Sequence, residues 1–375
     1  MLCFRRHRVL SFGTLTFALT WGFALLVVIG CGSSTSDDNV ANDEGTTETV
    51  IPVAPHDFSA GAPWFECGSL TPPEGVEVVT LLDGVDHFFG SEDKRTVRQP
   101  ATLPSGKNWG SVALKLQLDC PDSGLCDHWD RLATVGLELA EGEPTVELAR
   151  YITPYRKEMC TFTDVTELSP VLQGDLNVVS FIDTWVGPGH SSGEGWKTTA
   201  ELWFYPDNTM AGPDEVINIW PMRRVNVGSL EDGSTVDEQL VDETFTIDGV
   251  VRRVEAHLVA TGHGFGHSLN CAEFCQMEHT ISINGLEYTV NQWRGDCDEN
   301  PVSPQAGTWQ YGRNGWCPGA ISIGDKLDLS AGIIPGENTI GVRVRLAGGD
   351  EYDNTSPAAD STPGEYISLK LYVYR

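Results

Sequence analysis

Basic side chains are scarce in this 375-residue chain, which has 24 Lys and Arg against 53 Asp and Glu and a formal net charge of −29. Proteins that bind nucleic acid or anionic lipid depend on Lys and Arg to neutralise phosphate groups. The shortage of basic residues therefore excludes nucleic acid as the expected partner, and it favours a neutral or cationic ligand.

Helical periodicity is absent from every long stretch of the sequence. Instead, runs that alternate apolar and polar residues follow one another, which is the period of half-buried strands. In SVALKLQLD the apolar positions are Val112, Leu114, Leu116 and Leu118. The step Asn284-Gly285 between two such runs is a strong hairpin signal. With 40 Gly and 21 Pro available for turns, the sequence predicts all-β sandwiches.

One long apolar run stands at the N-terminus. The basic start MLCFRRHRVL is followed by FALTWGFALLVVIG, which is the layout of a secretory signal. The end of the run, VIGC, resembles a bacterial lipobox, in which the cysteine is lipidated. A transmembrane anchor is the alternative, but the run is short for a span. We therefore expect residues 1–30 to be a lipoprotein signal peptide and acyl chains on Cys31 to be the only contact with the membrane.

The residue after the lipidated cysteine is Gly32, which gives no inner-membrane retention signal of the aspartate type. This favours an exported lipoprotein anchored at the outer membrane, on its periplasmic or cell-surface face. Residues 31–56 are rich in Ser, Thr, Asp and Gly and should form a flexible acidic tether. The Pro/Gly/Asp-rich stretch YPDNTMAGPDE divides the rest into a domain at 57–207 and a domain at 208–375. We expect a monomer.

The cysteine count predicts disulfides. Of ten cysteines, Cys3 would leave with the signal and Cys31 would carry lipid, and eight remain. An even number in an exported chain predicts four disulfides. Zinc is the alternative because two spacings are short, but neither is a CxxC motif. The two short spacings and one longer loop suggest three pairs, and elimination leaves the fourth: Cys120 with Cys126, Cys271 with Cys275, Cys297 with Cys317, and Cys67 with Cys160.

The first candidate site is the stretch LDCPDSGLCDHWDRLATV. A disulfide between Cys120 and Cys126 would hold Asp130 at the start of a strand, beside Trp129 and Arg131. The alternative is a turn with solvated acids. A rigid support, an aromatic platform and an arginine that can tune a carboxylate together favour a functional site.

Three further clusters contain acids or aromatic residues. GHGFGHSLNCAEFCQMEHT holds Glu273 inside a small disulfide ring, with glycines that allow close backbone approach. SFIDTWVGPG places Asp183 on one face of a strand with Phe181 and Trp185, an arrangement that suits sugar recognition. CDENPVSPQAGTWQYGRNGWCPG is a loop rich in Trp, Tyr and Arg. An exposed acid in a braced loop, and an acid at the end of a strand, are the alternatives for the first two.

These clusters resemble a known family. CDHWDRLATV, with ARYITPY after it, resembles the first-domain signature of the peptide-N-glycosidase F family. NCAEFCQMEHTISING and GTWQYGRNGWCPG resemble its two second-domain signatures in the same order. The resemblance covers roughly residues 76–375. It implies two side-by-side eight-stranded antiparallel jelly-roll β-sandwiches, braced by disulfides, with the active site at their interface.

The same resemblance implies a reaction. The family hydrolyses the amide between an asparagine side chain and the first N-acetylglucosamine of an N-glycan. The products are aspartate in the peptide and a glycosylamine, and no metal or organic cofactor is required. The expected partner of this chain is therefore an N-glycopeptide or N-glycoprotein.

The resemblance also assigns roles by position. The catalytic acids would be Asp130, Glu273 and Asp183, and the last of these stands where the family pattern has glutamate. Asp127 has no catalytic counterpart and is expected to be a turn residue. The substrate-binding side chains would be Arg131, Trp129, Trp185, Arg313 and Trp316, together with His263, which replaces a tryptophan of the family pattern.

The chemistry of amide hydrolysis agrees with these roles. The reaction needs an activated water or nucleophile, a stabilised oxyanion and a protonated leaving nitrogen. Arg131 should keep the neighbouring Asp130 ionised, so that this carboxylate acts as base or nucleophile. Glu273 lies in a more enclosed site, where burial should raise its pKa and make it an acid or a hydrogen-bond partner.

Three other functions remain open. A glycan-binding lipoprotein without activity would keep the aromatic residues and bind without cleaving. A glycosidase would use paired carboxylates to cut an acetal. A copper-dependent monooxygenase related to the peptidylglycine hydroxylases would share the double jelly-roll layout and need histidines and a methionine. The residues available for copper are His257, His263, His267, His279 and Met277, but the expected His-His-Met grouping is absent.

Overall fold

The computed structural model describes most of the chain beyond the N-terminal region. The described residues are 67, 70–107, 109–206, 212–227, 235–264, 271–300, 302–352 and 363–375. The predicted signal peptide, Cys31 and the tether lie outside them, and so does His267. No helix in these described ranges is both long and apolar enough to cross a membrane.

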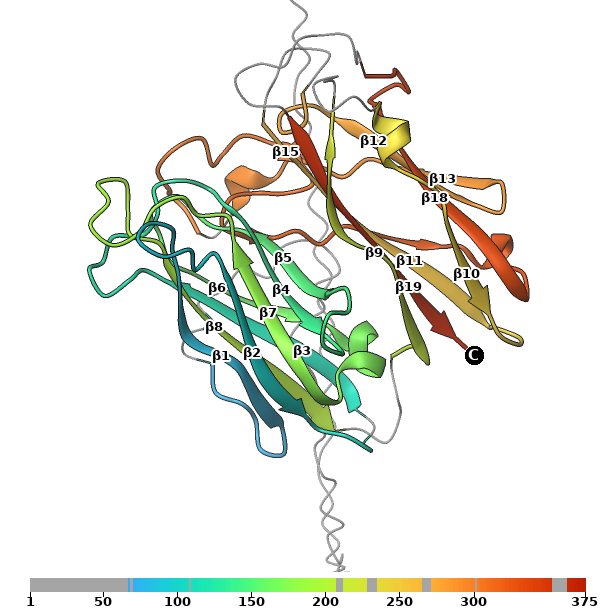
Figure 1. The fold of residues 1–375 in the computed structure, drawn as a ribbon, viewed down its shortest axis with the longest axis horizontal. Coiled ribbons are helices and arrows are strands. Elements are labelled where there is room, and N and C mark those ends of the chain that lie inside the picture. The colour runs from blue at the N-terminus through green and yellow to red at the C-terminus, as the bar shows by residue number, and fades with distance from the viewer. Residues whose placement is uncertain are drawn as a thin grey trace, which may run out of the picture. The chain divides into compact units, whose positions relative to one another are not determined.

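Eight strands from the first half of the chain form two antiparallel sheets that enclose one core (Figure 1). One sheet has the order β1-β8-β3-β6, and the other has β5-β4-β7-β2 with β16 added at its edge. The strands are β1 (Glu77–His87), β2 (Thr96–Leu103), β3 (Trp109–Asp119), β4 (Leu132–Glu138), β5 (Val146–Ile152), β6 (Met159–Asp164), β7 (Gly174–Ile182) and β8 (Trp196–Pro206).

Eight strands from the second half form a second pair of sheets, drawn from yellow to red in Figure 1. Their orders are β10-β18-β12-β13 and β17-β11-β19-β9, and every pairing is antiparallel. The strands are β9 (Glu215–Asn226), β10 (Glu243–Ile247), β11 (Arg253–His263), β12 (Met277–Ile283), β13 (Leu286–Val290), β17 (Asp325–Asp328), β18 (Gly336–Leu346) and β19 (Gly364–Tyr374).

The remaining elements are short. A two-stranded sheet pairs β14 (Trp293–Arg294) with β15 (Arg313–Asn314), and β16 (Ala320–Ile321) leaves the second half of the chain to pair with β5. The helical turns are η2 (Thr166–Val171), α1 (Val236–Gln239), η3 (Cys297–Glu299) and η4 (Ser330–Gly332). The expected class, two disulfide-braced β-sandwiches, is confirmed.

The alternating pattern read from the sequence explains the strands. In β3 the side chains of Val112, Leu114, Leu116 and Leu118 are all fully buried in the first core. Each such burial contributes roughly 1.5–3 kcal/mol relative to exposure. The predicted hairpin is also present, because Asn284 and its following glycine both have positive φ between β12 and β13. Asparagine and glycine tolerate this conformation better than other residues.

Three of the four disulfides within the described residues brace loops, and the fourth ties Cys67 to strand β6. The four bonds join Cys67 to Cys160, Cys120 to Cys126, Cys271 to Cys275 and Cys297 to Cys317, the pairs expected from the sequence. Two of them close small rings, because Cys120 and Cys126 are six positions apart and Cys271 and Cys275 are four positions apart. Such rings limit the conformations of the loops that carry the acids described below.

A buried arginine connects the two sandwiches. Arg150 on β5 donates from Nη1 to the Tyr366 carbonyl oxygen at 2.5 Å and from Nη2 to the Ser368 hydroxyl at 3.0 Å, both on β19. Its charge is paired with Glu147, from Nη2 to Oε2 at 3.0 Å. The guanidinium and the β16–β5 pairing therefore fix the edge of one sandwich to a sheet of the other.

Candidate active site

Asp130 is fixed at the start of β4 by a clamp on its two neighbours. The Arg131 amide donates to the Thr153 hydroxyl at 2.8 Å, and that hydroxyl donates to the Trp129 carbonyl oxygen at 3.2 Å. The Thr153 amide in turn donates to the Arg131 carbonyl oxygen at 2.9 Å. Three hydrogen bonds to one threonine thus set the direction of the Asp130 side chain, of which 13% is exposed.

The Asp130 carboxylate receives a short hydrogen bond from Tyr155. The phenol donates to Oδ2 at 2.6 Å, and its oxygen lies 3.2 Å from the Thr308 hydroxyl. Burial raises the pKa of Asp130 to about 6, the negative charge of Glu273 adds to the rise, and the Tyr155 hydrogen bond and Arg313 oppose it. Burial and the neighbouring Asp130 charge raise the pKa of Tyr155, so the phenol remains a donor.

Glu273 approaches the same place from the second sandwich. Its Oε1 accepts from Arg313 Nε at 3.1 Å, and its Oε2 accepts from the Gly264 amide at 3.3 Å. Burial raises the pKa of Glu273, and the charge of Arg313 opposes that rise. The predicted upward direction of this pKa, with burial as its cause, agrees with the structure.

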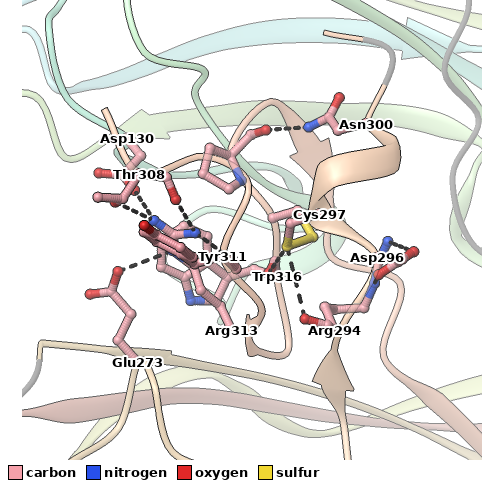
Figure 2. Close-up of a disulfide and its surroundings, with 12 residues drawn as sticks. Asp130, Glu273, Arg294, Asp296, Cys297, Asn300, Thr308, Tyr311, Arg313 and Trp316 are labelled. Atoms are coloured by element: carbon pink, nitrogen blue, oxygen red, sulfur yellow. Dashed lines mark hydrogen bonds and ion pairs between the residues drawn. A yellow bond between two sulfur atoms is a disulfide. The ribbon is translucent and has the colours of Figure 1, made fainter. Parts of the chain in front are cut away.

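The Arg313 guanidinium lies between the two acids and is fully buried. Its Nη2 is 3.6 Å from Asp130 Oδ2, as Figure 2 shows together with the contact to Glu273. Nη1 donates to the carbonyl oxygens of Thr308 at 3.0 Å and Tyr311 at 2.8 Å, and Nη2 donates to the Thr308 hydroxyl at 3.0 Å. These bonds leave the guanidinium little freedom, so it is a fixed positive charge for both acids.

The loop that carries Glu273 is locked at its backbone. The Glu273 amide donates to the Gly264 carbonyl oxygen at 3.0 Å, and the Asn314 amide donates to the Glu273 carbonyl oxygen at 2.9 Å. Gly262 passes so close to the Ala272 carbonyl that a Cβ at this position would collide with its oxygen. A glycine is therefore required here, as the glycine-rich sequence before the loop suggested.

Two carboxylates with a single cation between them favour a shared proton. Both acids are mostly buried, and each raises the cost of ionising the other. Burial raises the pKa of both acids, to about 6 for Asp130, and the fixed charge of Arg313 opposes the rise in each. The arrangement suits a reaction that takes a proton from one reactant and returns one to another.

The expected partnership of Arg131 with Asp130 is wrong. Arg131 pairs with Asp127 instead, from Nε to Oδ2 at 2.7 Å, and the Thr184 hydroxyl donates to the same oxygen at 2.7 Å. Asp127 is fully buried, and its Oδ1 accepts from the Trp129 amide at 3.1 Å, so it anchors this turn from the inside. The cation that faces Asp130 is Arg313, which comes from the other sandwich and cannot be found from sequence neighbours.

Asp183 follows β7 and faces a separate cation. Arg95 Nη1 lies 3.8 Å from Asp183 Oδ1, and its guanidinium stacks 4.3 Å from the Trp185 ring centroid. Burial raises the pKa of Asp183, while Arg131 and Arg95 lower it. The positive charge of Arg131 therefore lowers the pKa of Asp183 and also pairs with Asp127. Arg131 is next to Asp130 in sequence, so this third acid interacts with the segment that holds Asp130.

Two predicted aromatic residues are open to solvent. Trp129 is 56% exposed and Trp185 is 52% exposed, unusually high values for tryptophan. Trp185 also packs edge-on against Phe89, with ring centroids 5.2 Å apart, so its orientation is fixed. Each offers an apolar surface next to a predicted catalytic acid, the arrangement expected of a sugar-stacking platform.

Trp316 is not open, which corrects the expectation for it, whereas His263 is half-buried. Trp316 is 2% exposed, stacks on His263 with centroids 5.1 Å apart, and donates from its indole N–H to the Gly262 carbonyl oxygen at 2.6 Å. Its other neighbour is the Arg313 guanidinium, 4.7 Å from the ring centroid. Trp316 and His263 thus pack behind the acids and orient Arg313, and Trp316 presents no free face.

Sequence reasoning missed two residues of the site. Tyr155 lies in the stretch ARYITPY, but nothing in that run indicated that its hydroxyl reaches Asp130. Thr308 bonds to both Tyr155 and Arg313 from a loop of the second half of the chain. A buried tyrosine hydroxyl requires a partner, but the sequence alone does not say which one.

The histidines considered for copper lie apart. His257, in the middle of β11, bonds to Tyr372 and the Ile323 carbonyl oxygen, and His263 stacks on Trp316 at the end of that strand. His279 pairs with Glu365 inside the second sandwich. Within the described ranges no three His, Cys, Asp or Glu side chains form a group that could hold a metal ion.

The chain is similar to known proteins in sequence and in fold. Residues 233–372 match the family model described as Peptide-N-glycosidase F, C terminal. The chain is 24% identical over 273 residues to peptide-N(4)-(N-acetyl-beta-D-glucosaminyl)asparagine amidase F of Elizabethkingia miricola, covering 69% of this chain and 74% of that protein.

Solved structures share the fold. The structure of PNGase F, a glycosylasparaginase from Flavobacterium meningosepticum, is similar with a TM-score of 0.64 and 19% identity, over 80% of this chain and 96% of that one. PNGF-II is similar with a TM-score of 0.62 and 18% identity, over 80% of this chain and 66% of that one. At these identities the likeness establishes the two-sandwich architecture.

Proposed function

Because this chain belongs to the peptide-N-glycosidase F family, we propose that it is an amidohydrolase that releases N-glycans from glycopeptides or glycoproteins. The bond cleaved is the side-chain amide between asparagine and N-acetylglucosamine. The products are an aspartyl peptide and a glycosylamine. The observation that carries the proposal is the buried guanidinium of Arg313 shared by Asp130 and Glu273, which come from different sandwiches.

In the proposed reaction Asp130 activates the attack. A water molecule adds to the amide carbonyl carbon, and the Asp130 carboxylate takes its proton. The pKa of about 6 makes Asp130 mostly ionised near neutral pH and still basic enough to accept this proton. The Tyr155 hydroxyl, 2.6 Å from Oδ2, keeps the carboxylate oriented for this step.

The leaving nitrogen needs a proton before the carbon–nitrogen bond breaks. Glu273 is the proposed source, because burial raises its pKa and its loop places it across the guanidinium from Asp130. Asp183 is proposed to bind sugar hydroxyls beside Trp185. The Arg95 guanidinium stacks on the Trp185 ring and holds it in place. The exposed Trp129 is proposed to stack on the sugar next to the cleaved amide.

The experiment uses the purified protein, a defined N-glycopeptide and water enriched in heavy oxygen. Hydrolysis at the amide converts asparagine to aspartate and places one heavy oxygen in its carboxylate, which peptide mass spectrometry detects. Asp130→Asn should abolish this product. Asp122→Asn is the matched control, since Asp122 lies in the same disulfide loop with a side chain that is 94% exposed.

Two other outcomes would contradict the proposal. A glycosidase would leave N-acetylglucosamine on asparagine and incorporate the heavy oxygen into the released sugar. Saturable binding of the glycopeptide with no product would identify a glycan-binding protein, the alternative that the exposed Trp129 and Trp185 also fit.

A further inference from the structure

A cavity lies between the sandwiches, away from the acids. Its volume is about 460 Å³, and β5 and η2 line one side while β11, β17 and β19 line the other. Ligand pockets in proteins have volumes of about 300–1,000 Å³, far more than a single ordered water occupies. None of the residues assigned to the candidate active site lines this cavity.

A row of basic side chains crosses one wall of this cavity. On neighbouring strands His257 is directly opposite Lys326 on one side and Lys370 on the other. Directly opposed residues of antiparallel strands share one face of the sheet. Leu258 and Leu371, their neighbours in sequence, point into the core, so the row faces the cavity.

Two members of the row already have partners. His257 donates from Nε2 to the Ile323 carbonyl oxygen at 2.7 Å, and its Nδ1 accepts from the Tyr372 hydroxyl at 3.0 Å. Both ring nitrogens are therefore used by a neutral imidazole, and burial lowers the pKa of His257 to about 3. Lys326 forms an ion pair with Glu167, also at the cavity wall.

Lys370 has no such partner. It is 2% exposed, and its ammonium makes no hydrogen bond or ion pair with any residue in the described part of the chain. Burial lowers the pKa of Lys370 and the charge of Glu147 opposes this, but Glu147 Oε2 accepts from Arg150 at 3.0 Å and its Oε1 accepts from the Ser368 hydroxyl at 3.2 Å. A buried ammonium that donates no hydrogen bond to a carboxylate is costly, so Lys370 has the capacity to pair with a further negative group.

A second donor without a partner lines the same cavity. The Ser322 hydroxyl is buried and has no hydrogen-bond partner among the described residues, although the Ser322 amide donates to the Arg150 carbonyl oxygen. The remaining acids are engaged elsewhere: Asp164 accepts from the amide and hydroxyl of Thr166, and Asp325 bonds to Gln292. The Ser322 hydroxyl and the Lys370 ammonium can therefore both donate to a ligand in the cavity.

We propose that this cavity binds a small organic carboxylate, which pairs with the Lys370 ammonium and accepts a hydrogen bond from the Ser322 hydroxyl. Lys370 belongs to β19, and Ser322 follows β16 at the edge of β5, so the ligand contacts both sandwiches. Binding stabilises their interface, because a ligand that binds only the folded protein raises the melting temperature. The proposal does not depend on the proposed enzymatic function.

The test measures binding to the purified full chain by titration calorimetry and by thermal melting. The probes are acetate, succinate and glucuronate, with glucose as the uncharged counterpart of glucuronate and sodium chloride at equal ionic strength. At least one carboxylate should bind with one site per chain and raise the melting temperature, and glucose and chloride should not. If none of the three carboxylates binds, or glucose binds as well as glucuronate, the proposal is wrong.

Variants identify the site. Lys370→Gln should weaken carboxylate binding at least tenfold, Ser322→Ala should weaken it severalfold, and Lys107→Gln, a change at an exposed lysine, should leave it unchanged. Equal affinity in Lys370→Gln and the parent protein would overturn the assignment. If Lys370→Gln does not fold, the affinity of Ser322→Ala and a crystal structure of the parent protein with the bound carboxylate test the site instead. Electron density for the carboxylate away from Lys370 would contradict the proposal.

Discussion

The hydroxyl of Tyr155 donates to Oδ2 of Asp130 at 2.6 Å. This bond favours the ionised carboxylate, whereas burial and the charge of Glu273 favour the protonated form and raise the pKa of Asp130 to about 6. Groups from both sandwiches therefore raise or lower the pKa of the proposed base, Asp130. Removing any one of these groups should shift that pKa in a known direction.

Tyr155→Phe should raise the pKa of Asp130, because it removes the hydrogen bond that lowers it. The acidic limb of kcat/KM against pH should move upward by roughly one unit, since a charged hydrogen bond contributes about 1.5–3 kcal/mol and one pKa unit corresponds to about 1.4 kcal/mol. Tyr311→Phe is the control, because Arg313 binds only the backbone carbonyl of Tyr311. An unshifted acidic limb in Tyr155→Phe would exclude Asp130 as the titrating base.

Asp130→Asn should abolish activity and stabilise the fold above pH 6. The folded pKa of about 6 is higher than the ordinary value of 3.8, so the folded protein loses stability as pH rises from about 4 through 6. At pH 8 the ionised Asp130 lowers the free energy of unfolding by about 3 kcal/mol. An asparagine is uncharged and has no such effect. Denaturant unfolding should show the gain at pH 8 and little difference at pH 4; a variant less stable than the parent at pH 8 would contradict the buried-charge argument.

Arg313→Met should destabilise the protein by about 3–5 kcal/mol, because it leaves two mostly buried carboxylates without their cation. The pKa values of Asp130 and Glu273 should both rise, since Arg313 lowers both. The loss of stability should therefore be larger at pH 8 than at pH 5, where the acids are protonated more readily. Arg294→Met, which removes a pair with the partly exposed Asp296, should cost about 1 kcal/mol or less at either pH.

Trp185→Ala should raise KM for a glycopeptide roughly tenfold with a smaller change in kcat, because an exposed ring that stacks on the sugar contributes to binding and not to the proton transfers. Steady-state kinetics at fixed pH separates the two parameters. Val250→Ala, a change at an apolar residue that is 88% exposed, serves as the control. A fall in kcat at unchanged KM would place Trp185 in the chemical step instead.

Cys31→Ser should release the exported protein from the membrane fraction. The expected lipid is attached to the thiol of Cys31, a residue outside the described ranges, and serine cannot carry a thioether. Fractionation of cells and metabolic labelling with a fatty acid measure the effect. Cys3→Ser, within the expected signal peptide, should leave both anchoring and labelling unchanged, and a Cys31→Ser protein that stays lipidated would refute the lipobox.

Local sequence was sufficient where structure depends on neighbours along the chain. Alternation predicted β3, the Asn284-Gly285 step predicted the β12–β13 hairpin, and cysteine spacing predicted the small ring around Glu273. The same local reasoning failed for Arg131, because adjacency in sequence says nothing about direction: its side chain turns to Asp127.

The sequence by itself determined the β-sandwich class, the disulfide-braced loops and the acids Asp130 and Glu273 as candidates, because periodicity and short loops are local properties. Only the tertiary structure decided that Arg313 is their common cation, that Tyr155 is the hydrogen-bond donor to Asp130, and that Trp316 is buried. These relations join residues that are not neighbours in sequence, since Tyr155 lies 25 positions from Asp130 and Arg313 lies 40 positions from Glu273. The pKa of each acid depends on the burial and charges that such residues supply. The unpaired ammonium of Lys370 has the same origin, since only the packing of one sandwich on the other removes it from water.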